Sequence, residues 1–148
     1  MGMARLAREV STLGPLGRIA HAPGTAGALA AAVVGYGVAA AGGAAVAVLG
    51  ACVTIMGQWA VLARGDVQDD PREVVVDEAA GQLVAVLGVR PDMVHFITAL
   101  ILFRLFDVWK PWPIRVVERK GGVWAVMGDD LAAGCAARIV LLGIDACL

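Results

Sequence analysis

The longest uncharged segment of the chain runs from residue 19 to residue 63 and reads IAHAPGTAGALAAAVVGYGVAAAGGAAVAVLGACVTIMGQWAVLA. It contains no Lys, Arg, Asp or Glu, and it is rich in alanine and glycine. A helix that crosses a bilayer needs about 20 apolar residues, so this segment is long enough for two. The pair Gly42-Gly43 can form the turn between them. A buried hairpin in a soluble protein is the alternative, but the segment offers no charged face to water.

The composition of the whole chain also points to a membrane protein. Apolar residues make up 59% of the 148 residues, charged residues make up only 17%, and the mean hydropathy is +0.78. These values exclude a disordered chain and argue against an ordinary soluble enzyme. The net charge of −1 gives no basic field for nucleic acid. The three cysteines lie far apart and form neither a metal-binding pattern nor a disulfide framework.

The apolar pattern predicts an all-α fold in one domain over residues 1–148, a compact polytopic membrane bundle of about five main helices. The first and last charged residues around each apolar run, together with Pro91 and the glycines, set the expected boundaries. The expected main helices are 25–40, 44–63, 72–89, 91–109 and 129–147. A short amphipathic helix at 1–12 is expected to lie on the membrane surface.

The distribution of basic residues predicts an orientation. With the N-terminus in the cytoplasm, ten of the twelve basic residues fall on the cytoplasmic side, as the positive-inside rule requires. These are Arg5, Arg8, Arg18, Arg64, Arg72, Arg104, Lys110, Arg115, Arg119 and Lys120. The sequence therefore predicts a multi-pass protein of the bacterial inner membrane, with its polar site on the cytoplasmic side.

Two acidic pairs stand in apolar surroundings, Asp77-Glu78 and Asp129-Asp130. A carboxylate inside an apolar helix is costly unless it is paired or bound to a cation. The alternatives are that the first pair favours the dipole of a helix start and that the second pair is an N-cap. Two such pairs at the same depth would suit Mg²⁺, which takes carboxylates together with phosphate oxygens.

Basic residues near these pairs are candidates for binding phosphate. Arg104, Asp107 and Lys110 are spaced by three and share a helical face, although an internally paired surface face would look the same. The segment KPWPIR at 110–115 breaks the helix and sets Lys110 and Arg115 at a fixed span. The turn at Gly24-Thr25 precedes a helix whose free N–H groups could meet an anion, although Thr25 could be a simple N-cap.

Four blocks of the sequence together resemble one enzyme family. They are APGTAG at 22–27, DPREVVVDEAAGQ at 70–82, FRLFDVWKPWPIR at 103–115 and VMGDDLAAG at 126–134. Their order and content are similar to those of phosphatidylglycerophosphatase A, and they span most of the chain. One departure is visible, because the family usually has a glycine shortly before the VM of the last block. This chain has Val123-Trp124-Ala125 there.

The resemblance implies an integral membrane phosphatase that converts phosphatidylglycerophosphate to phosphatidylglycerol and requires Mg²⁺. It implies catalytic roles for Asp77, Glu78, Asp107, Asp129 and Asp130. We expect several of the carboxylates of Asp77, Glu78, Asp129 and Asp130 to hold the metal, which would activate a water molecule for in-line attack. The resemblance assigns binding of the substrate phosphate to Gly24, Thr25, Arg104, Lys110 and Arg115. An aspartyl-phosphate intermediate is left open, whereas the absence of a C-x₅-R motif excludes a cysteine phosphatase.

Two other functions remain open at this point. Intramembrane carboxylates also mark ion paths, so a small ion or proton transporter is one rival. A helical phosphatase of a water-soluble phosphomonoester is the other. The expected partners are the lipid substrate and membrane lipids, with no nucleic acid, and the oligomeric state is left open.

Overall fold

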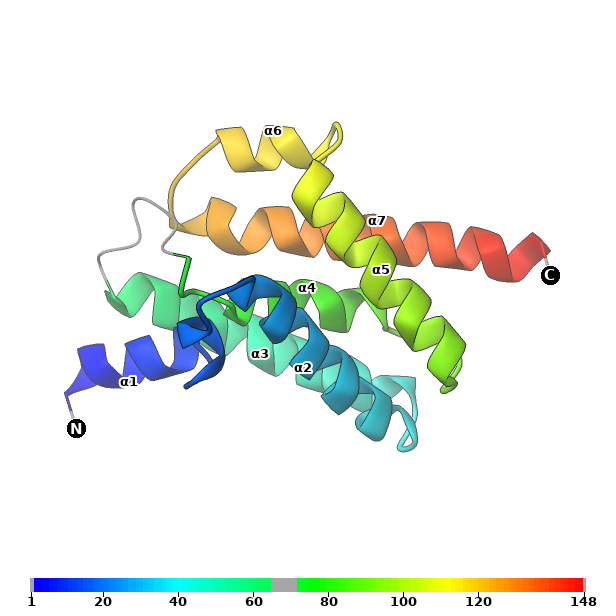
Figure 1. Ribbon diagram of the computed structural model, residues 1–148, viewed down its shortest axis with the longest axis horizontal. Coiled ribbons are helices and arrows are strands. Elements are labelled where there is room, and N and C mark those ends of the chain that lie inside the picture. Colours follow the sequence, from blue (N-terminus) through cyan, green and yellow to red (C-terminus); the bar gives the residue numbers. More distant parts are fainter. Residues whose placement is uncertain (1, 65–71, 148) are drawn as a thin grey trace.

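The computed structural model describes residues 2–64 and 72–147, which form helices joined by turns, with no strand in these two ranges (Figure 1). The elements in chain order are α1 (Met3–Ser11), the 3₁₀ helix η1 (Leu16–Arg18), α2 (Pro23–Ala39), α3 (Gly43–Arg64), α4 (Val76–Ala85), α5 (Met93–Trp109), α6 (Ile114–Arg119) and α7 (Val123–Cys147). The expectation of an all-α fold is therefore confirmed.

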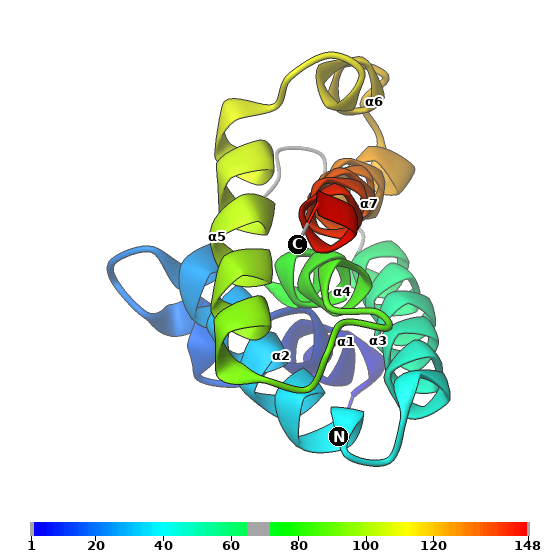
Figure 2. The ribbon, with the colours of Figure 1, turned by 90° about the vertical axis from the view of Figure 1, so that its right-hand side faces the viewer.

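Helix α4 lies in the middle of the bundle and is almost entirely buried. It contacts α2, α3, α5 and α7, and Figure 2 shows it between α7 on one side and α2 and α3 on the other. With ten residues it is only about 15 Å long, half the thickness of a bilayer core. It is thus a central packing element and cannot be one of five full-length membrane helices.

Two glycines allow α4 and α7 to pack so closely that their backbones are in contact. A Cβ on Gly134 would lie 2.2 Å from the carbonyl oxygen of Gly81, and a Cβ on Gly81 would lie 2.5 Å from the carbonyl oxygen of Asp130. Side chains cannot fit at such distances, so the crossing requires small residues, as in many membrane helix pairs. The crossing brings Asp130 next to α4.

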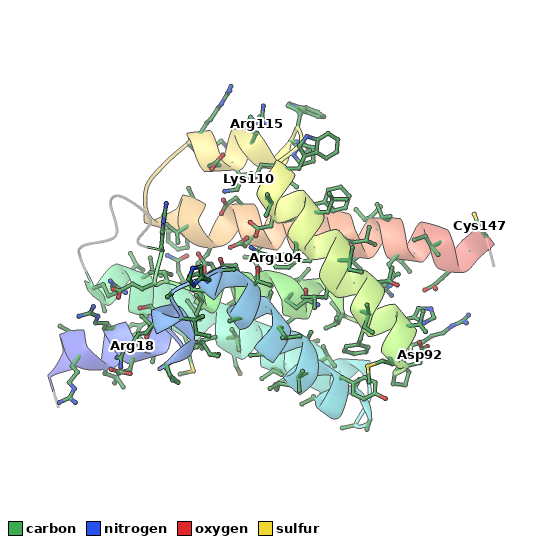
Figure 3. All side chains as sticks on the ribbon, in the orientation of Figure 1. Arg18, Asp92, Arg104, Lys110, Arg115 and Cys147 are labelled. Atoms are coloured by element: carbon green, nitrogen blue, oxygen red, sulfur yellow. The ribbon has the colours of Figure 1, made fainter. Side chains whose placement is uncertain are left out.

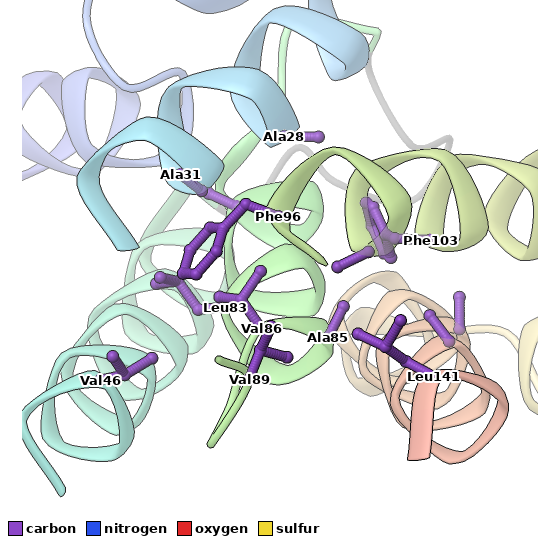
Figure 4. Close-up of a cluster of buried hydrophobic side chains, with 14 of the residues drawn as sticks. Ala28, Ala31, Val46, Leu83, Ala85, Val86, Val89, Phe96, Phe103 and Leu141 are labelled. Carbon is purple, nitrogen blue, oxygen red and sulfur yellow. The ribbon is translucent and has the colours of Figure 1, made fainter. Parts of the chain in front are cut away.

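The main hydrophobic cluster fills the space between α4 and its neighbours (Figure 4). Helix α2 contributes the small residues Ala28 and Ala31, and α5 contributes Phe96 and Phe103. The remaining labelled members are Val46, Leu83, Ala85, Val86, Val89 and Leu141. This cluster fixes α2, α5 and α7 around α4 and so fixes the relative positions of their ends.

The boundaries of α2, α3 and α5 lie within two residues of those expected, with Gly42 in the turn. The expected helix 72–89 is wrong at both ends. The backbone N–H of Val75 donates to the carbonyl oxygen of Ser11 at 3.0 Å, which holds the preceding residues outside the helix. Gly88, with φ of +64°, turns the chain away after Ala85. Residues 86–92, rather than a continued helix, lead to α5.

The last two helices also differ from the expectation. Helix α6 was not expected, because its six residues follow directly on two prolines. Helix α7 begins at Val123 instead of residue 129. Gly121 and Gly122 both have positive φ and complete the turn after α6, so the helix resumes at once. The residues Val123-Trp124-Ala125, which depart from the family pattern, form its first turn.

The exterior of the bundle is strongly apolar. Helix α3 is the one described helix that is long and apolar enough to span a membrane, and α2 is similarly apolar but shorter. Large apolar side chains are exposed on most of the described helices, for example Val33 on α2, Ile55 on α3, Ile101 on α5 and Ile139 on α7. Such an extensive apolar surface is unusual for a soluble monomer.

Candidate active site

Most of the acidic and basic residues singled out in the sequence gather around one cavity. The start of α2, the first turn of α4, the last turns of α5 and the second turn of α7 enclose a cavity of about 260 Å³. Figure 3 shows Arg104 and Lys110 near the middle of the view, well apart from Asp92 and Cys147 at its right-hand side. The lining residues are Ala22, Pro23, Gly24, Arg72, Val74, Asp77, Glu78, Arg104, Asp107, Lys110, Val126, Asp129 and Asp130.

Three carboxylates form the acidic centre of the cavity. One oxygen each from Asp77, Glu78 and Asp130 lies within 4.8 Å of the others. Asp77 and Asp130 are buried, and Glu78 is half-buried. Among the residues that the structure describes, Glu78 Oε2 and Asp130 Oδ1 have no hydrogen-bond partner. Crowded carboxylates in a largely buried cavity, with these oxygens of Glu78 and Asp130 available, are the donor set that a divalent cation prefers. The residues present therefore fit a metal ion.

Asp129 lies outside this group of three and holds Lys110 instead. Its Oδ2 accepts a hydrogen bond from Lys110 Nζ at 2.6 Å, and Glu118 Oε1 accepts a second at 2.8 Å. Burial acts to lower the pKa of Lys110, but these two partners outweigh it and hold the pKa above its ordinary value. The ammonium group thus stays charged and oriented at the cavity wall.

The interpretation of Asp129-Asp130 as an N-cap is wrong, because α7 begins six residues earlier and the pair lies in its second turn. The alternative that Asp77 and Glu78 favour the dipole at a helix start is partly right, since both lie in the first turn of α4. They also belong to the acidic centre. A favourable helix dipole and a role in the cavity are therefore compatible at that pair.

Arg104 connects the acidic centre to α5. Its Nη1 donates to Asp107 Oδ2 at 2.5 Å and lies 3.9 Å from Glu78 Oε1. Both residues of the Arg104–Asp107 pair line the cavity and are half-buried, so the pair is not a surface feature. Asp107 fixes one edge of the guanidinium and leaves its other donors available.

Gly24 allows the start of α2 to touch the acidic centre. A Cβ at this position would lie 1.8 Å from Glu78 Oε1 and 3.4 Å from Arg104 Nη1. The neighbouring Thr25 is exposed and does not line the cavity. Ala22, rather than Thr25, occupies the N-cap position, and no side chain caps the helix. The N-cap interpretation of Thr25 is therefore wrong, and Gly24 contributes through the close approach.

Arg115 does not reach the cavity. It is exposed on α6, and its Nη2 donates to the carbonyl oxygen of Trp109 at 3.4 Å. Lys110 ends α5 in the left-handed conformation and is directed toward α7, whereas Figure 3 shows Arg115 on the outer side of the molecule. The structure thus brings Lys110 to the acidic centre and leaves Arg115 apart from it.

The chain matches the model of the family described as phosphatidylglycerophosphatase A over residues 9–145. It belongs to the phosphatidylglycerophosphatase A family. This membership makes the protein a phosphatase, in agreement with the resemblance seen in its motifs. The match covers the cavity residues and, at least in part, each of the α-helices in the described ranges.

Two curated relatives of this phosphatidylglycerophosphatase A family protein differ in name. A Bacteroides thetaiotaomicron protein, provisionally named phosphatidylinositol-3-phosphatase, is 38% identical over 131 residues, which is 81% of each chain. The Escherichia coli K12 protein named phosphatidylglycerophosphatase A is 35% identical over 68 residues, 44% of this chain and 39% of that protein. No solved structure matches the chain. The names agree on a phosphatase of a phospholipid and differ in the head group.

Among the charged residues that line the cavity of this phosphatidylglycerophosphatase A family member, Arg72 was missed by the sequence reasoning. Arg72 lines the cavity from the segment that precedes α4. It stands within the block DPREVVVDEAAGQ at 70–82. Its place five residues before Asp77 was a usable signal, because a basic residue so close to an acidic centre can reach the same ligand.

Proposed function

We propose that the protein is a Mg²⁺-dependent lipid phosphatase that hydrolyses the terminal phosphomonoester of phosphatidylglycerophosphate to phosphatidylglycerol and inorganic phosphate. The observation that carries the proposal is the meeting of three carboxylates with Arg104 and Lys110 around one cavity. A phosphomonoester is doubly charged near neutral pH, so carboxylates alone would repel it. Carboxylates that hold a divalent cation beside two fixed cationic groups would attract it.

Each residue has a part in this proposal. Asp77, Glu78 and Asp130 would hold Mg²⁺, which when bound supplies a Lewis acid that lowers the pKa of a coordinated water. Arg104 and Lys110 donate to the non-bridging oxygens of the phosphate, where negative charge develops. Hydrolysis forms a bond from the water oxygen to phosphorus and breaks the bond from phosphorus to the glycerol oxygen, which leaves with a proton.

Asp107 and Asp129 act as positioning residues, since they orient Arg104 and Lys110. Both cations keep donors for the substrate. A guanidinium has five N–H groups and an ammonium three, and the contacts described use only some of them. Metal ligation by Asp129, and phosphate binding by Thr25 and Arg115, stay predictions that rest on the motifs.

The apolar exterior supports a place in the membrane, with the cavity at the cytoplasmic end of a multi-pass bundle. Helices α2, α3, α5 and α7 expose large apolar side chains. The basic residues Arg64 and Lys110 lie at the C-terminal ends of α3 and α5, and Lys110 lines the cavity, as expected if this end faces the cytoplasm. The phosphate of a lipid at the membrane surface would enter the cavity while the acyl chains stay in the bilayer.

Three substrates distinguish the proposed function from its rivals. In mixed micelles with Mg²⁺, we expect phosphate release from phosphatidylglycerophosphate to exceed release from phosphatidylinositol 3-phosphate by at least about 10-fold in kcat/KM. Water-soluble glycerol 3-phosphate should be poorer still, because a truncated substrate loses the binding energy of its missing parts. The assay measures inorganic phosphate from purified protein.

Three other outcomes of this assay would contradict the proposed substrate or the proposed activity. A preference for phosphatidylinositol 3-phosphate would indicate the substrate for which the Bacteroides relative is named. A preference for glycerol 3-phosphate would indicate an enzyme of soluble substrates. Absence of phosphate release from all three would contradict the proposal and favour an ion path through the carboxylates.

A further inference from the structure

Among the described residues, three cationic side chains line the active-site cavity, and they are not equivalent. Arg104 is bound to Asp107, and Lys110 is bound to Asp129 and Glu118. Arg72 has no hydrogen bond or ion pair with any residue in the described ranges 2–64 and 72–147. It is the cavity cation whose charge the described protein leaves unpaired, so an anionic ligand would gain most from it.

The neighbouring Glu73 is not free to neutralise Arg72. Its Oε2 accepts from Arg8 Nη2 at 3.0 Å, and its Oε1 accepts from Arg64 Nη2 at 2.7 Å. The hydrogen bonds from Arg8 and Arg64 hold the pKa of Glu73 below its ordinary value. Both carboxylate oxygens are therefore committed to the anchoring of α1 and α3.

The backbone that carries Arg72 is held in place. A Cβ on Gly17 would lie 2.0 Å from the carbonyl oxygen of Glu73, so η1 packs directly on this segment. The N–H of Val75 donates to the carbonyl oxygen of Ser11 at 3.0 Å. These contacts present the guanidinium from a fixed base, which lowers the entropic cost of ordering it on a ligand.

Arg72 stands where two cavities meet. A second cavity of about 400 Å³ adjoins the active site and shares Ala22, Pro23 and Arg72 with it. Gly17, Ile19 and Ala20 contribute to its outer wall. A ligand that extends from the acidic centre past Arg72 would enter this second cavity.

The substrate of the proposed function has two phosphates, a terminal monoester and a phosphodiester one glycerol unit away. With the monoester at Asp77, Glu78 and Asp130, the phosphodiester must lie elsewhere in or beside the cavity. We propose that Arg72 binds this phosphodiester, and that the protein thereby selects lipids that carry a second phosphate. This inference rests on the proposed function and adds a second anion site to it.

Product inhibition separates the two phosphate sites, since phosphatidylglycerol keeps only the phosphodiester and inorganic phosphate resembles only the monoester. For Arg72→Gln we expect KM and the inhibition constant of phosphatidylglycerol to rise about 10-fold, as for loss of a charge-assisted hydrogen bond. The value of kcat and the inhibition constant of inorganic phosphate should stay within twofold. Arg72→Lys should recover part of the loss, because it keeps the charge without the planar pair of donors.

The exposed Arg5 provides the matched control. Arg5→Gln removes the same charge from α1, away from the cavity, and should change none of these constants. If Arg5→Gln raised KM and the inhibition constant of phosphatidylglycerol as much as Arg72→Gln does, Arg72 would act only through general attraction of anions, and the proposal would be rejected. An unchanged inhibition constant for phosphatidylglycerol in Arg72→Gln would overturn the proposal. A loss of kcat with weaker inhibition by inorganic phosphate would overturn it too, by placing Arg72 at the monoester.

A binding measurement keeps this test independent of turnover. Calorimetric titration with short-chain phosphatidylglycerol should show about 10-fold weaker binding to Arg72→Gln than to wild type. If wild type released no phosphate from phosphatidylglycerophosphate, the proposed function would fail, while this titration would still test the phosphodiester site. Equal affinities of the two proteins would reject that site.

Discussion

Replacement of Asp130 by asparagine is expected to lower kcat by at least about 100-fold while the protein stays folded. Asp130 is buried, lies with Asp77 and Glu78 in the acidic centre, and has an oxygen free of partners among the described residues. Asparagine keeps the shape but removes the charge that would hold a cation, which costs several kcal/mol of transition-state stabilisation. Steady-state phosphate release at saturating Mg²⁺ measures the effect.

The same substitution should not lower stability, which distinguishes a ligand from a structural residue. Removal of one of three mutually repelling carboxylates should leave the thermal midpoint in detergent unchanged or raise it, as is common at active sites. The control is Asp145→Asn at the other end of α7, where the carboxylate accepts from His95 Nε2 at 2.9 Å. Near-normal activity of Asp130→Asn, or equal losses in both variants, would remove Asp130 from the catalytic group.

Replacement of Gly24 by alanine should lower kcat by about 100-fold. The added Cβ would lie 1.8 Å from Glu78 Oε1 and 2.7 Å from its Cδ, so the carboxyl group must move. A displacement of this size at a reacting centre can cost about 100-fold in rate. Kinetics and circular dichroism on the same preparation show whether activity falls while the helices persist.

Helix α2 provides a matched control for this substitution. Gly37 lies in the same helix with nothing within 4 Å of a Cβ. Gly37→Ala should leave kcat unchanged and raise stability by about 0.5–1 kcal/mol, because alanine favours the helix. A normal kcat for Gly24→Ala would show that α2 does not constrain Glu78.

The sequence predicted the elements whose signals are local. The charge-free segment indicated α2 and α3, and Gly42 marked the turn, because apolar length and turn chemistry are visible in a short window. The limits of α4 were not visible in this way. The run Val74–Val76 is apolar and suits either a strand or a buried helix, and its pairing with Ser11 is a contact across 64 residues.

The candidate site was predictable in its composition but not in its division of roles. Asp77, Glu78, Arg104 and Lys110 stood out because their charges interrupt apolar helices. That Asp129 holds Lys110 while Asp130 joins the acidic centre depends on how α5, α6 and α7 pack.

The cavity is lined by Arg72 and not by the expected Arg115, and this difference also depends on tertiary packing. The spacing of residues 110–115 does not indicate in which direction the chain runs after Lys110. The left-handed conformation of Lys110, followed by α6, leaves Arg115 outside the cavity. The path of residues 72–75 against η1 and α1 brings Arg72 to the cavity wall instead.

Titration of metal-stripped protein with Mg²⁺, with phosphate release from phosphatidylglycerophosphate in mixed micelles as the readout, tests most directly whether the acidic centre holds a catalytic cation. We expect no release in the presence of a chelator, a saturable rise to the full rate as Mg²⁺ is added, and less than about 1% of that rate for Asp130→Asn at any Mg²⁺ concentration. Full activity of wild type in excess chelator, or an Asp130→Asn titration that matches wild type, would contradict the account.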